Sequence, residues 1–344
     1  MIFPANIDGA IILSPSNLFY FTGYYNEDAA ILFTERENFY ITDKRCLEEA
    51  EAMIKGFKIV DSEGSAYAEK AAELLSRSGG ASVGVEYDEI SYKNYLSIEK
   101  YFKNICSVSD LIGELRAVKN ATELQKIRSA QAVTDKIYEK VLEIVKPGKF
   151  TEHGLQAAID MMIVSAGGTP AFETIVAFGE NTSKPHCHPG DRILKNGDVV
   201  TIDFGAKLNG YCSDMTRSFA VGVAPEGYKE VYEAVLNAKN ISEDKIKAGM
   251  TGKECDAVAR NYLTEKGFGQ YFTHSLGHSL GIDIHESPNL SPQCDKKIPE
   301  GAVTSVEPGI YLPGKFGVRI EDIVLFKNSG VENLTNSPEN LIIV

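Results

Sequence analysis

Four acidic residues and one histidine in the C-terminal half of the chain are of the types that hold divalent metal ions. They are Asp203, Asp214, His278, Glu307 and Glu321. Carboxylate oxygens with a single imidazole form a hard ligand set, which suits two cations sharing bridging carboxylates better than one tetrahedral zinc ion. Two such cations can hold a hydroxide at neutral pH and polarise a carbonyl group. The sequence therefore predicts a dinuclear metallohydrolase.

A β-hairpin is predicted to bring Asp203 and Asp214 together. Asn209-Gly210 lies between them, and Asn-Gly between apolar strands is the strongest short signal for a hairpin. This turn places Gly205 opposite Asp214, and both carboxylates then lie diagonally on one face, about 7–8 Å apart at their α-carbons. Two surface aspartates on an ordinary hairpin are the alternative. An unpaired carboxylate in the apolar run 199–204 would be costly, which disfavours that alternative for Asp203.

A second hairpin is predicted around Gly314, midway between Glu307 and Glu321. Glycine and proline residues mark the turn, and the pairing would bring the two glutamates face to face. Arg319, two residues before Glu321, points to the same face. It could orient a glutamate or bind the carboxylate of a substrate. A single glutamate of this kind would more often be a solvated charge.

Three histidines lie within twelve residues: His274, His278 and His285. His278 is the only imidazole predicted to be a metal ligand, and the HExxH motif of zincins is absent from the segment. The segment His186-Cys187-His188 could look like a metal cluster by itself. We discount that interpretation, because no second group of soft ligands lies at a suitable spacing.

The composition is that of a soluble, acidic cytoplasmic protein rather than a nucleic-acid or membrane protein. The 344 residues predict two domains. A net charge of −13 argues against binding to nucleic acid, which needs a basic patch. The chain has neither an apolar run of about 18–20 residues nor a signal peptide. Its six cysteines include no CxxC pair, so reduced thiols fit better than a disulfide framework.

Short apolar runs alternate with amphipathic stretches in the first third of the chain, which predicts a small α/β domain ending near Arg116. Strands are expected at residues 9–13, 29–33, 38–42 and 82–86, and helices at 44–55, 65–76 and 92–102.

The remaining two thirds of the chain are predicted to contain two blocks, each with a pair of helices and several strands. A long helix is expected from the capping box at Asn120–Glu123 to Pro147-Gly148. Further helices are predicted at 151–165, 225–247 and 251–266. We detect no sequence repeat between the two blocks.

The segments DFG, SDMTR, HSLGHSLGIDIHE, VEPGIY and VRIED, in this order, resemble those of the metal-dependent pita-bread peptidases. Among these, the chain is most similar to the Xaa-Pro peptidases: prolidase (Xaa-Pro dipeptidase) and Xaa-Pro aminopeptidase. The resemblance extends over nearly the whole chain. It implies an α+β protein in which a smaller α/β, creatinase-like N-terminal domain (1–116) precedes a pita-bread catalytic domain (117–344).

The resemblance also implies a role for each ligand. Asp203 would bind one metal ion, Asp214 and Glu321 would bridge both ions, and His278 and Glu307 would bind the other. The reaction would be hydrolysis of an X–Pro bond in a di- or oligopeptide by a metal-bridging hydroxide. The metal ions would be manganese, with cobalt or zinc as possibilities, and the protein would be a homodimer.

Other residues receive catalytic and substrate-binding roles by the same resemblance. Glu307 would relay the proton, and His285 would contact the substrate carbonyl and stabilise the tetrahedral intermediate. His186 matches a substrate-binding histidine and His274 a further histidine of the active site. Arg319 could bind the substrate carboxylate.

Two alternatives to an X–Pro peptidase are a non-catalytic pita-bread binding module and a metal-free creatinase-type C–N hydrolase. Binding modules of this kind lack metal ligands, and a creatinase-type hydrolase does not need all five of them. A methionine aminopeptidase shares the site but usually lacks the N-terminal domain.

The chain departs from the family pattern at two places. Asn289 stands where several prolidases have an arginine, and Cys187-His188 replaces the usual Gly-Val. The preference for dipeptides or longer peptides is therefore left open.

Overall fold

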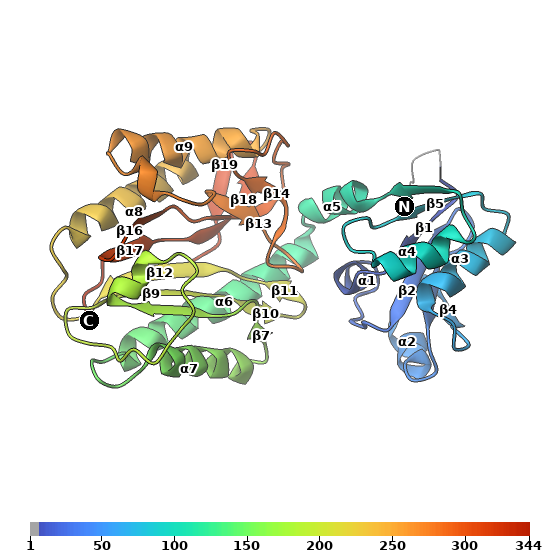
Figure 1. Cartoon of the computed structure of the whole chain (residues 1–344), viewed down its shortest axis with the longest axis horizontal. Coiled ribbons are helices and arrows are strands. Elements are labelled where there is room, and N and C mark those ends of the chain that lie inside the picture. Colours follow the sequence, from blue (N-terminus) through green and yellow to red (C-terminus); the bar gives the residue numbers. More distant parts are fainter. Residues whose placement is uncertain (1–6) are drawn as a thin grey trace. The chain divides into compact units, whose positions relative to one another are not determined.

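The computed structural model describes residues 7–344. Contacts between α-carbons divide the chain into two compact units, Met1–Arg116 and Ala117–Val344. The two units are described separately below (Figure 1).

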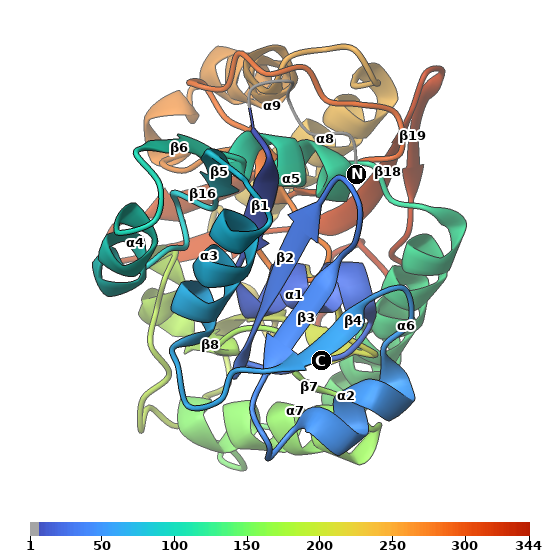
Figure 2. The same ribbon diagram turned by 90° about the vertical axis from the view of Figure 1, so that its right-hand side faces the viewer.

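The N-terminal unit is built on one mixed six-stranded sheet in the order β4-β3-β2-β1-β5-β6. Figure 2 shows β2, β3 and β4 side by side. One face of the sheet packs against α3 and α4, and the other face packs against α1, α2 and α5. The strands are β1 (Gly9–Ile12), β2 (Ala29–Thr34), β3 (Phe39–Thr42), β4 (Lys58–Asp61), β5 (Ser82–Val85) and β6 (Asn104–Ser107), and the helices are α1 (Pro15–Thr22), α2 (Leu47–Met53), α3 (Tyr67–Arg77), α4 (Tyr92–Glu99) and α5 (Ser109–Ala117).

Four elements of this unit were not predicted from the sequence: α1, α5, β4 and β6. The strands β4 and β6 form the two edges of the sheet, and their residues are only partly buried. Edge strands lack the strong apolar alternation on which the prediction relied. Helix α1 did carry local signals, because Pro15 occupies its first turn and Gly23 ends it with a φ of 71°.

The C-terminal unit contains two helix pairs, α6–α7 and α8–α9, with strands between them (Figure 1). The first pair packs on the sheet β12-β9-β8, and the second packs on the sheet β14-β13-β15-β18-β19. The helices are α6 (Ala121–Ile144), α7 (Glu152–Ser165), α8 (Tyr228–Lys245) and α9 (Gly252–Glu265). The strands are β7 (Thr169–Pro170), β8 (Ile175–Phe178), β9 (Val199–Phe204), β10 (Ala206–Leu208), β11 (Tyr211–Cys212), β12 (Met215–Ala220), β13 (Gly277–Ser279), β14 (Glu286–Leu290), β15 (Val303–Val306), β16 (Gly309–Leu312), β17 (Phe316–Arg319), β18 (Asp322–Lys327) and β19 (Gly330–Asn333).

The predicted capping box at the start of α6 is confirmed. The Asn120 side chain accepts hydrogen bonds from the backbone N–H groups of Thr122 and Glu123, and Glu123 Oε2 accepts one from Asn120 N at 2.9 Å. These bonds satisfy backbone donors that would otherwise have no partner in the first helical turn. The start of the longest helix is therefore fixed by three neighbouring residues.

The two halves of the C-terminal unit repeat the same backbone connections. Leu194 N donates to Phe150 O at 3.0 Å before α7, and Ile298 N donates to Met250 O at 2.8 Å before α9. The bridge between Thr151 and Ile193 likewise has a counterpart between Thr251 and Lys297. The two blocks seen in the sequence therefore share these connections, although we detect no sequence repeat between them.

Candidate metal centre

The first predicted hairpin holds Asp203 and Asp214. Strands β9 and β12 pair antiparallel, with Asp203 opposite Thr216 and Phe204 opposite Met215. Lys207 pairs with Cys212 nearer the turn, so the predicted register holds on both sides of Gly205 and Asp214. A Cβ atom at Gly205 would lie 1.9 Å from Ser213 O, so only glycine fits where the two chains approach each other.

The second predicted hairpin is formed by β16 and β17, and Gly309 pairs with Arg319. Glu307 and Glu321 lie just beyond these strands, where each backbone N–H bonds to a different part of the unit. Glu307 N donates to Leu276 O at 2.8 Å, and Glu321 N donates to Thr216 O at 3.1 Å. The first bond ties Glu307 to the segment before His278, and the second ties Glu321 to the strand that follows Asp214.

Four of the five predicted ligands converge around His278. One ligand atom each from Asp214, His278 and Glu321 lies within 4.8 Å of the others. His278 Nε2 is 3.4 Å from Asp214 Oδ2 and 3.6 Å from Glu307 Oε1. The fifth residue, Asp203, is close enough for its charge to raise the pKa of Asp214. The hairpins and β13 thus bring together residues that are up to 118 positions apart in the chain.

Two carboxylate oxygens of this cluster are buried and have no hydrogen-bond partner: Asp203 Oδ1 and Asp214 Oδ1. A buried polar atom without a partner is costly, and such atoms are rare in native proteins. Divalent cations are the partners that clustered carboxylates with one imidazole prefer. The residues present therefore fit a metal centre.

The carboxyl groups hold their protons more tightly than exposed carboxyl groups do. Burial raises the pKa of Asp214 to about 6 and that of Glu307 to about 7. Burial, with the charges of Asp214 and Glu307, raises the pKa of Glu321 well above its ordinary value. Burial alone would lower the pKa of His278, but its hydrogen bond to Asp214 and the charge of Glu307 outweigh that effect and raise the pKa to about 9.

These pKa values predict that metal affinity rises with pH and that binding releases protons. A cation binds carboxylates and neutral imidazole, so it must displace protons that Asp214 retains below about pH 6, Glu307 below about pH 7 and His278 below about pH 9. Between pH 9 and 6 the affinity for Mn²⁺ should therefore fall steadily. Calorimetric titration of metal-stripped protein in two buffers with different ionisation heats measures the protons released. An affinity that stays constant over this range, with no proton release, would contradict the prediction.

A network of hydrogen bonds from Arg319 and Thr216 orients Asp203 and Glu321. Arg319 Nη2 donates to Asp203 Oδ2 at 2.6 Å, and Arg319 Nε donates to Thr216 Oγ1 at 2.9 Å. The Thr216 hydroxyl in turn donates to Glu321 Oε2 at 2.6 Å. The acidic partner of Arg319 is thus an aspartate, and not one of the glutamates considered in the sequence analysis. Sequence reasoning also missed Thr216, although it lies within the SDMTR segment.

Tyr311 is a second residue that sequence reasoning missed. Its hydroxyl group is 2.7 Å from Arg319 Nη1 and 2.9 Å from His274 Nε2. His274 Nδ1 contacts Ser275 O at 2.8 Å, so both of its ring nitrogens have protein partners. Burial and the charge of Arg319 lower the pKa of His274 to about 3, which keeps the ring neutral. The sequence signal that could have identified Tyr311 was its position at the end of the VEPGIY segment.

His285 and His186 are exposed and lie near the buried cluster. The rings of His285 and His278 meet edge to face, with centroids 4.5 Å apart. The charge of His186 contributes to lowering the pKa of both His285 and His274, which places His186 near both rings. The predicted metal ligands and the four other predicted residues therefore occupy one region of the C-terminal unit.

A buried ion pair supports the backbone beside Glu321. Arg217 Nη2 donates to Asp322 Oδ1 at 2.7 Å, and both side chains are almost completely buried. The same guanidinium donates to the carbonyl oxygens of Glu321, Ser337 and Pro338 at 2.6–2.9 Å. Arg217 thus connects a ligand-bearing strand to the C-terminal segment of the chain.

We expect Arg217→Met to lower the free energy of unfolding by about 1–3 kcal/mol, because it leaves Asp322 Oδ1 and several carbonyl oxygens buried without their donor. Lys239 and Asn333 still contact Asp322 Oδ2. Arg217→Lys is the matched control. Lysine keeps the charge but not the planar set of hydrogen-bond donors, so we expect Arg217→Lys to lose less stability than Arg217→Met. Urea unfolding of metal-stripped protein measures both. A loss of less than about 1 kcal/mol for Arg217→Met would contradict this role.

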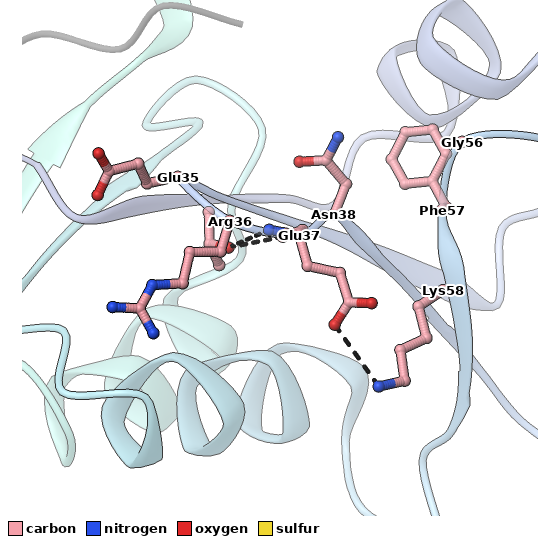
Figure 3. Close-up of a pocket in the computed structure, with 8 residues that line it drawn as sticks. Glu35, Arg36, Glu37, Asn38, Gly56, Phe57 and Lys58 are labelled. Atoms are coloured by element: carbon pink, nitrogen blue, oxygen red, sulfur yellow. Dashed lines mark hydrogen bonds and ion pairs between the residues drawn. The ribbon is translucent and has the colours of Figure 1, made fainter.

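The N-terminal unit has a surface depression of its own. Figure 3 shows its lining at the turn between β2 and β3, where Lys58 Nζ is 3.5 Å from Glu37 Oε2. The Thr34 hydroxyl donates to Glu37 O at 2.6 Å. Glu37 and Lys58 are thus paired with each other across the turn and β4, and these contacts do not indicate a ligand.

Comparison with known proteins identifies the family. Residues 125–328 match metallopeptidase family M24, which is more than half of the chain. The chain belongs to metallopeptidase family M24. Residues 4–118 match the creatinase/prolidase N-terminal domain. The predicted family is therefore confirmed, and so is the prediction that the chain is a metallopeptidase.

Relatives of known structure show the same two-domain architecture. An Xaa-Pro dipeptidase from Bacillus anthracis superposes with a TM-score of 0.94 at 35% identity, covering 99% of this chain and 96% of that chain. An X-Pro aminopeptidase from Thermotoga maritima gives a TM-score of 0.91 at 33% identity, covering 98% of each chain. In sequence, the Xaa-Pro dipeptidase of Pyrococcus furiosus is 35% identical over 347 residues, which is 98% of this chain and 96% of that protein. The predicted α+β pita-bread fold with a creatinase-like N-terminal domain is confirmed.

Among residues 7–344, no helix combines the length and the apolar character needed to cross a membrane.

Proposed function

We propose that this metallopeptidase hydrolyses X–Pro peptide bonds with two divalent cations, most simply manganese, held by Asp203, Asp214, His278, Glu307 and Glu321. The observation that carries the proposal is the convergence of Asp214, His278 and Glu321 within 4.8 Å, beside buried carboxylate oxygens that lack partners. The relatives support the substrate class, because they include Xaa-Pro dipeptidases and an X-Pro aminopeptidase. When bound, the two cations would activate water and polarise the scissile carbonyl group.

Glu307 is the proposed proton carrier. Glutamate is one of the side chains that commonly act as general acid or base in enzymes. A carboxylate oxygen of Glu307 would accept a proton from the attacking water and pass it to the proline nitrogen, which carries no hydrogen before cleavage. Ser305 Oγ donates to Glu307 Oε1 at 3.2 Å, which helps to fix that carboxylate.

His285 and His186 are the proposed contacts to the reacting peptide. Both imidazoles are exposed at the buried cluster, so they are available to a substrate. His285 would donate a hydrogen bond to the oxygen on which negative charge develops. Burial and the charge of His278 lower the pKa of His285, so a neutral ring would serve as this donor.

The predicted substrate contacts of His274 and Arg319 stay predictions. In the structure Arg319 donates to Asp203, Thr216 and Tyr311, and His274 is bonded to Tyr311. A substrate carboxylate would have to exchange with one of these partners. We therefore favour the alternative role for Arg319, which is to orient a carboxylate ligand.

We expect metal-loaded protein to cleave an X–Pro dipeptide, an X–Pro–Y tripeptide, or both, and not the matched X–Ala peptides. The ratio of kcat/KM for the dipeptide and the tripeptide decides between a dipeptidase and an aminopeptidase, which Asn289 and Cys187-His188 leave open. Mn²⁺, Co²⁺ and Zn²⁺ are compared at equal occupancy to identify the most active metal. Failure of every metal-loaded form to cleave any of the peptides would overturn the proposal.

We further propose that the protein acts as a homodimer in the cytoplasm on proline-containing peptides. The reduced cysteines support the compartment: the six cysteines are unpaired in the structure. Sedimentation of the purified chain tests the oligomeric state.

A further inference from the structure

A buried ion pair lies directly behind the loop that carries His285. Lys119 Nζ is 3.0 Å from Glu286 Oε2, and only 1% and 6% of the two side chains are exposed. The other carboxylate oxygen, Glu286 Oε1, accepts hydrogen bonds from Ile282 N at 2.9 Å and Asp283 N at 3.1 Å. One carboxylate therefore closes the loop 282–286 on itself and connects it to Lys119.

Gly281 allows this closure. A Cβ atom at this position would lie 2.9 Å from both Glu286 oxygens and 3.0 Å from Lys119 Cε, so a larger residue would push the ion pair apart. Gly281 O also accepts a hydrogen bond from Cys212 N at 2.7 Å. Since Cys212 is two residues before Asp214, the loop is tied to the ligand hairpin as well as to the ion pair.

Lys119 is itself held firmly. Its backbone N–H donates to Gly301 O at 3.0 Å, and the next residue, Asn120, caps helix α6. The ammonium group therefore projects from a fixed point of the C-terminal unit. Its partner Glu286 is adjacent in sequence to His285, whose ring packs against the ligand His278.

Stability alone does not account for this ion pair. Apolar residues of similar volume usually stabilise an interior at least as well as a buried ion pair does, because desolvation of the charges offsets their attraction. An ion pair with directional hydrogen bonds differs in fixing one geometry. A loop that presents a reacting side chain needs such a fixed geometry, since a displacement of about 1 Å can cost on the order of a hundredfold in rate.

We propose that Lys119 and Glu286 are positioning residues that hold His285 against the metal centre in the orientation needed for catalysis. The inference rests on the proposed function in taking His285 as a group that contacts the reacting peptide. Neither positioning residue touches substrate. Their effect on the rate passes through the 282–286 loop and is lost when His285 is absent.

Steady-state kinetics of Glu286→Gln, alone and combined with His285→Ala, test the proposal. We expect Glu286→Gln to lower kcat on an X–Pro peptide by about tenfold to a hundredfold, with the metal content unchanged. In the His285→Ala background the same substitution should lower kcat by less than about twofold, because the group that it positions is gone. Glu226→Gln, at an exposed position before α8, is the matched control and should leave kcat unchanged. Equal losses in both backgrounds would overturn the proposal, as would an unchanged kcat in the single variant.

Two further measurements keep the test independent of folding and of the proposed function. The double variant Lys119→Met/Glu286→Gln removes both charges, leaves no uncompensated buried ion and should show the same coupling to His285. Hydrogen exchange of the metal-stripped protein reports the loop without any catalysis. The Ile282 and Asp283 amides should lose protection in Glu286→Ala, which removes their acceptor, but not in Glu226→Ala. Unchanged protection would contradict the role of Glu286. If the wild type cleaves no peptide but the variant still loses this protection, only the proposed function is contradicted.

Discussion

Replacing Asp214 by asparagine should lower kcat/KM on X–Pro peptides by at least about a thousandfold, well beyond the ~10–100-fold typical of residues behind a metal ligand. Asp214, His278 and Glu321 each place one ligand atom within 4.8 Å of the others. Its Oδ1 atom is buried without a partner. Asparagine keeps the shape of the side chain but removes the charge that a bridging ligand supplies. Steady-state kinetics with saturating Mn²⁺ measure the loss.

The same substitution should leave the metal-stripped protein as stable as the wild type, or more stable. Burial raises the pKa of Asp214 from its ordinary 3.8 to about 6. The folded state therefore binds this proton more tightly than the unfolded state, and the contribution to stability falls as the pH rises from about 4 through 6. At pH 7 the ionised Asp214 carries that cost, which asparagine avoids, while Glu307 Oε1 still lies 3.6 Å from His278 Nε2 and offsets the charge of the protonated ring. Asp191→Asn is the control, because the Asp191 side chain is 98% exposed. Wild-type turnover in Asp214→Asn would remove Asp214 from the site, and global unfolding would contradict the stability argument.

Glu307→Gln should lower kcat by about a hundredfold to ten-thousandfold, the range attributed to general acid–base catalysis. Glutamine retains an oxygen that can accept the hydrogen bond from Ser305 Oγ, but it cannot carry a proton between water and the proline nitrogen. Rapid kinetics should locate the loss in the chemical step. Glu226→Gln again serves as the control.

Metal content separates the two roles assigned to Glu307. If the loss in Glu307→Gln comes mainly from proton transfer, a second equivalent of Mn²⁺ should still bind at high concentration while kcat stays low. Full recovery of kcat at high Mn²⁺ would show that Glu307 acts only as a ligand, which would contradict its role as proton carrier.

The hairpins were predictable because their signals are local. Asn209-Gly210 sets the register that carries Asp203 and Asp214, and the turn at Gly314 sets the pairing of β16 with β17. A carboxylate in the apolar run before Gly205 was equally visible. These features depend on neighbouring residues, so they can be read without knowledge of the tertiary structure.

The hydrogen bonds and ion pairs that orient the ligands and the His285 loop were not predictable in this way. Thr216 and Tyr311 lie within segments that resemble those of the family, but the partners of Thr216, Tyr311 and Lys119 are 105, 37 and 167 residues away in the chain. Such contacts arise from the packing of strands and helices distant in sequence. Arg319 illustrates the limit: its orientation was predicted correctly as facing the ligands, but its partner on the opposite hairpin was not.

The central claim is that one cluster of side chains holds two divalent cations. Crystals of the protein grown with Mn²⁺, measured at a wavelength where manganese scatters anomalously, test it most directly. We predict two anomalous peaks that share Asp214 and Glu321, with Asp203 on one ion and His278 and Glu307 on the other. A fully occupied crystal with a single peak, or with manganese bound away from these carboxylates, would contradict the account.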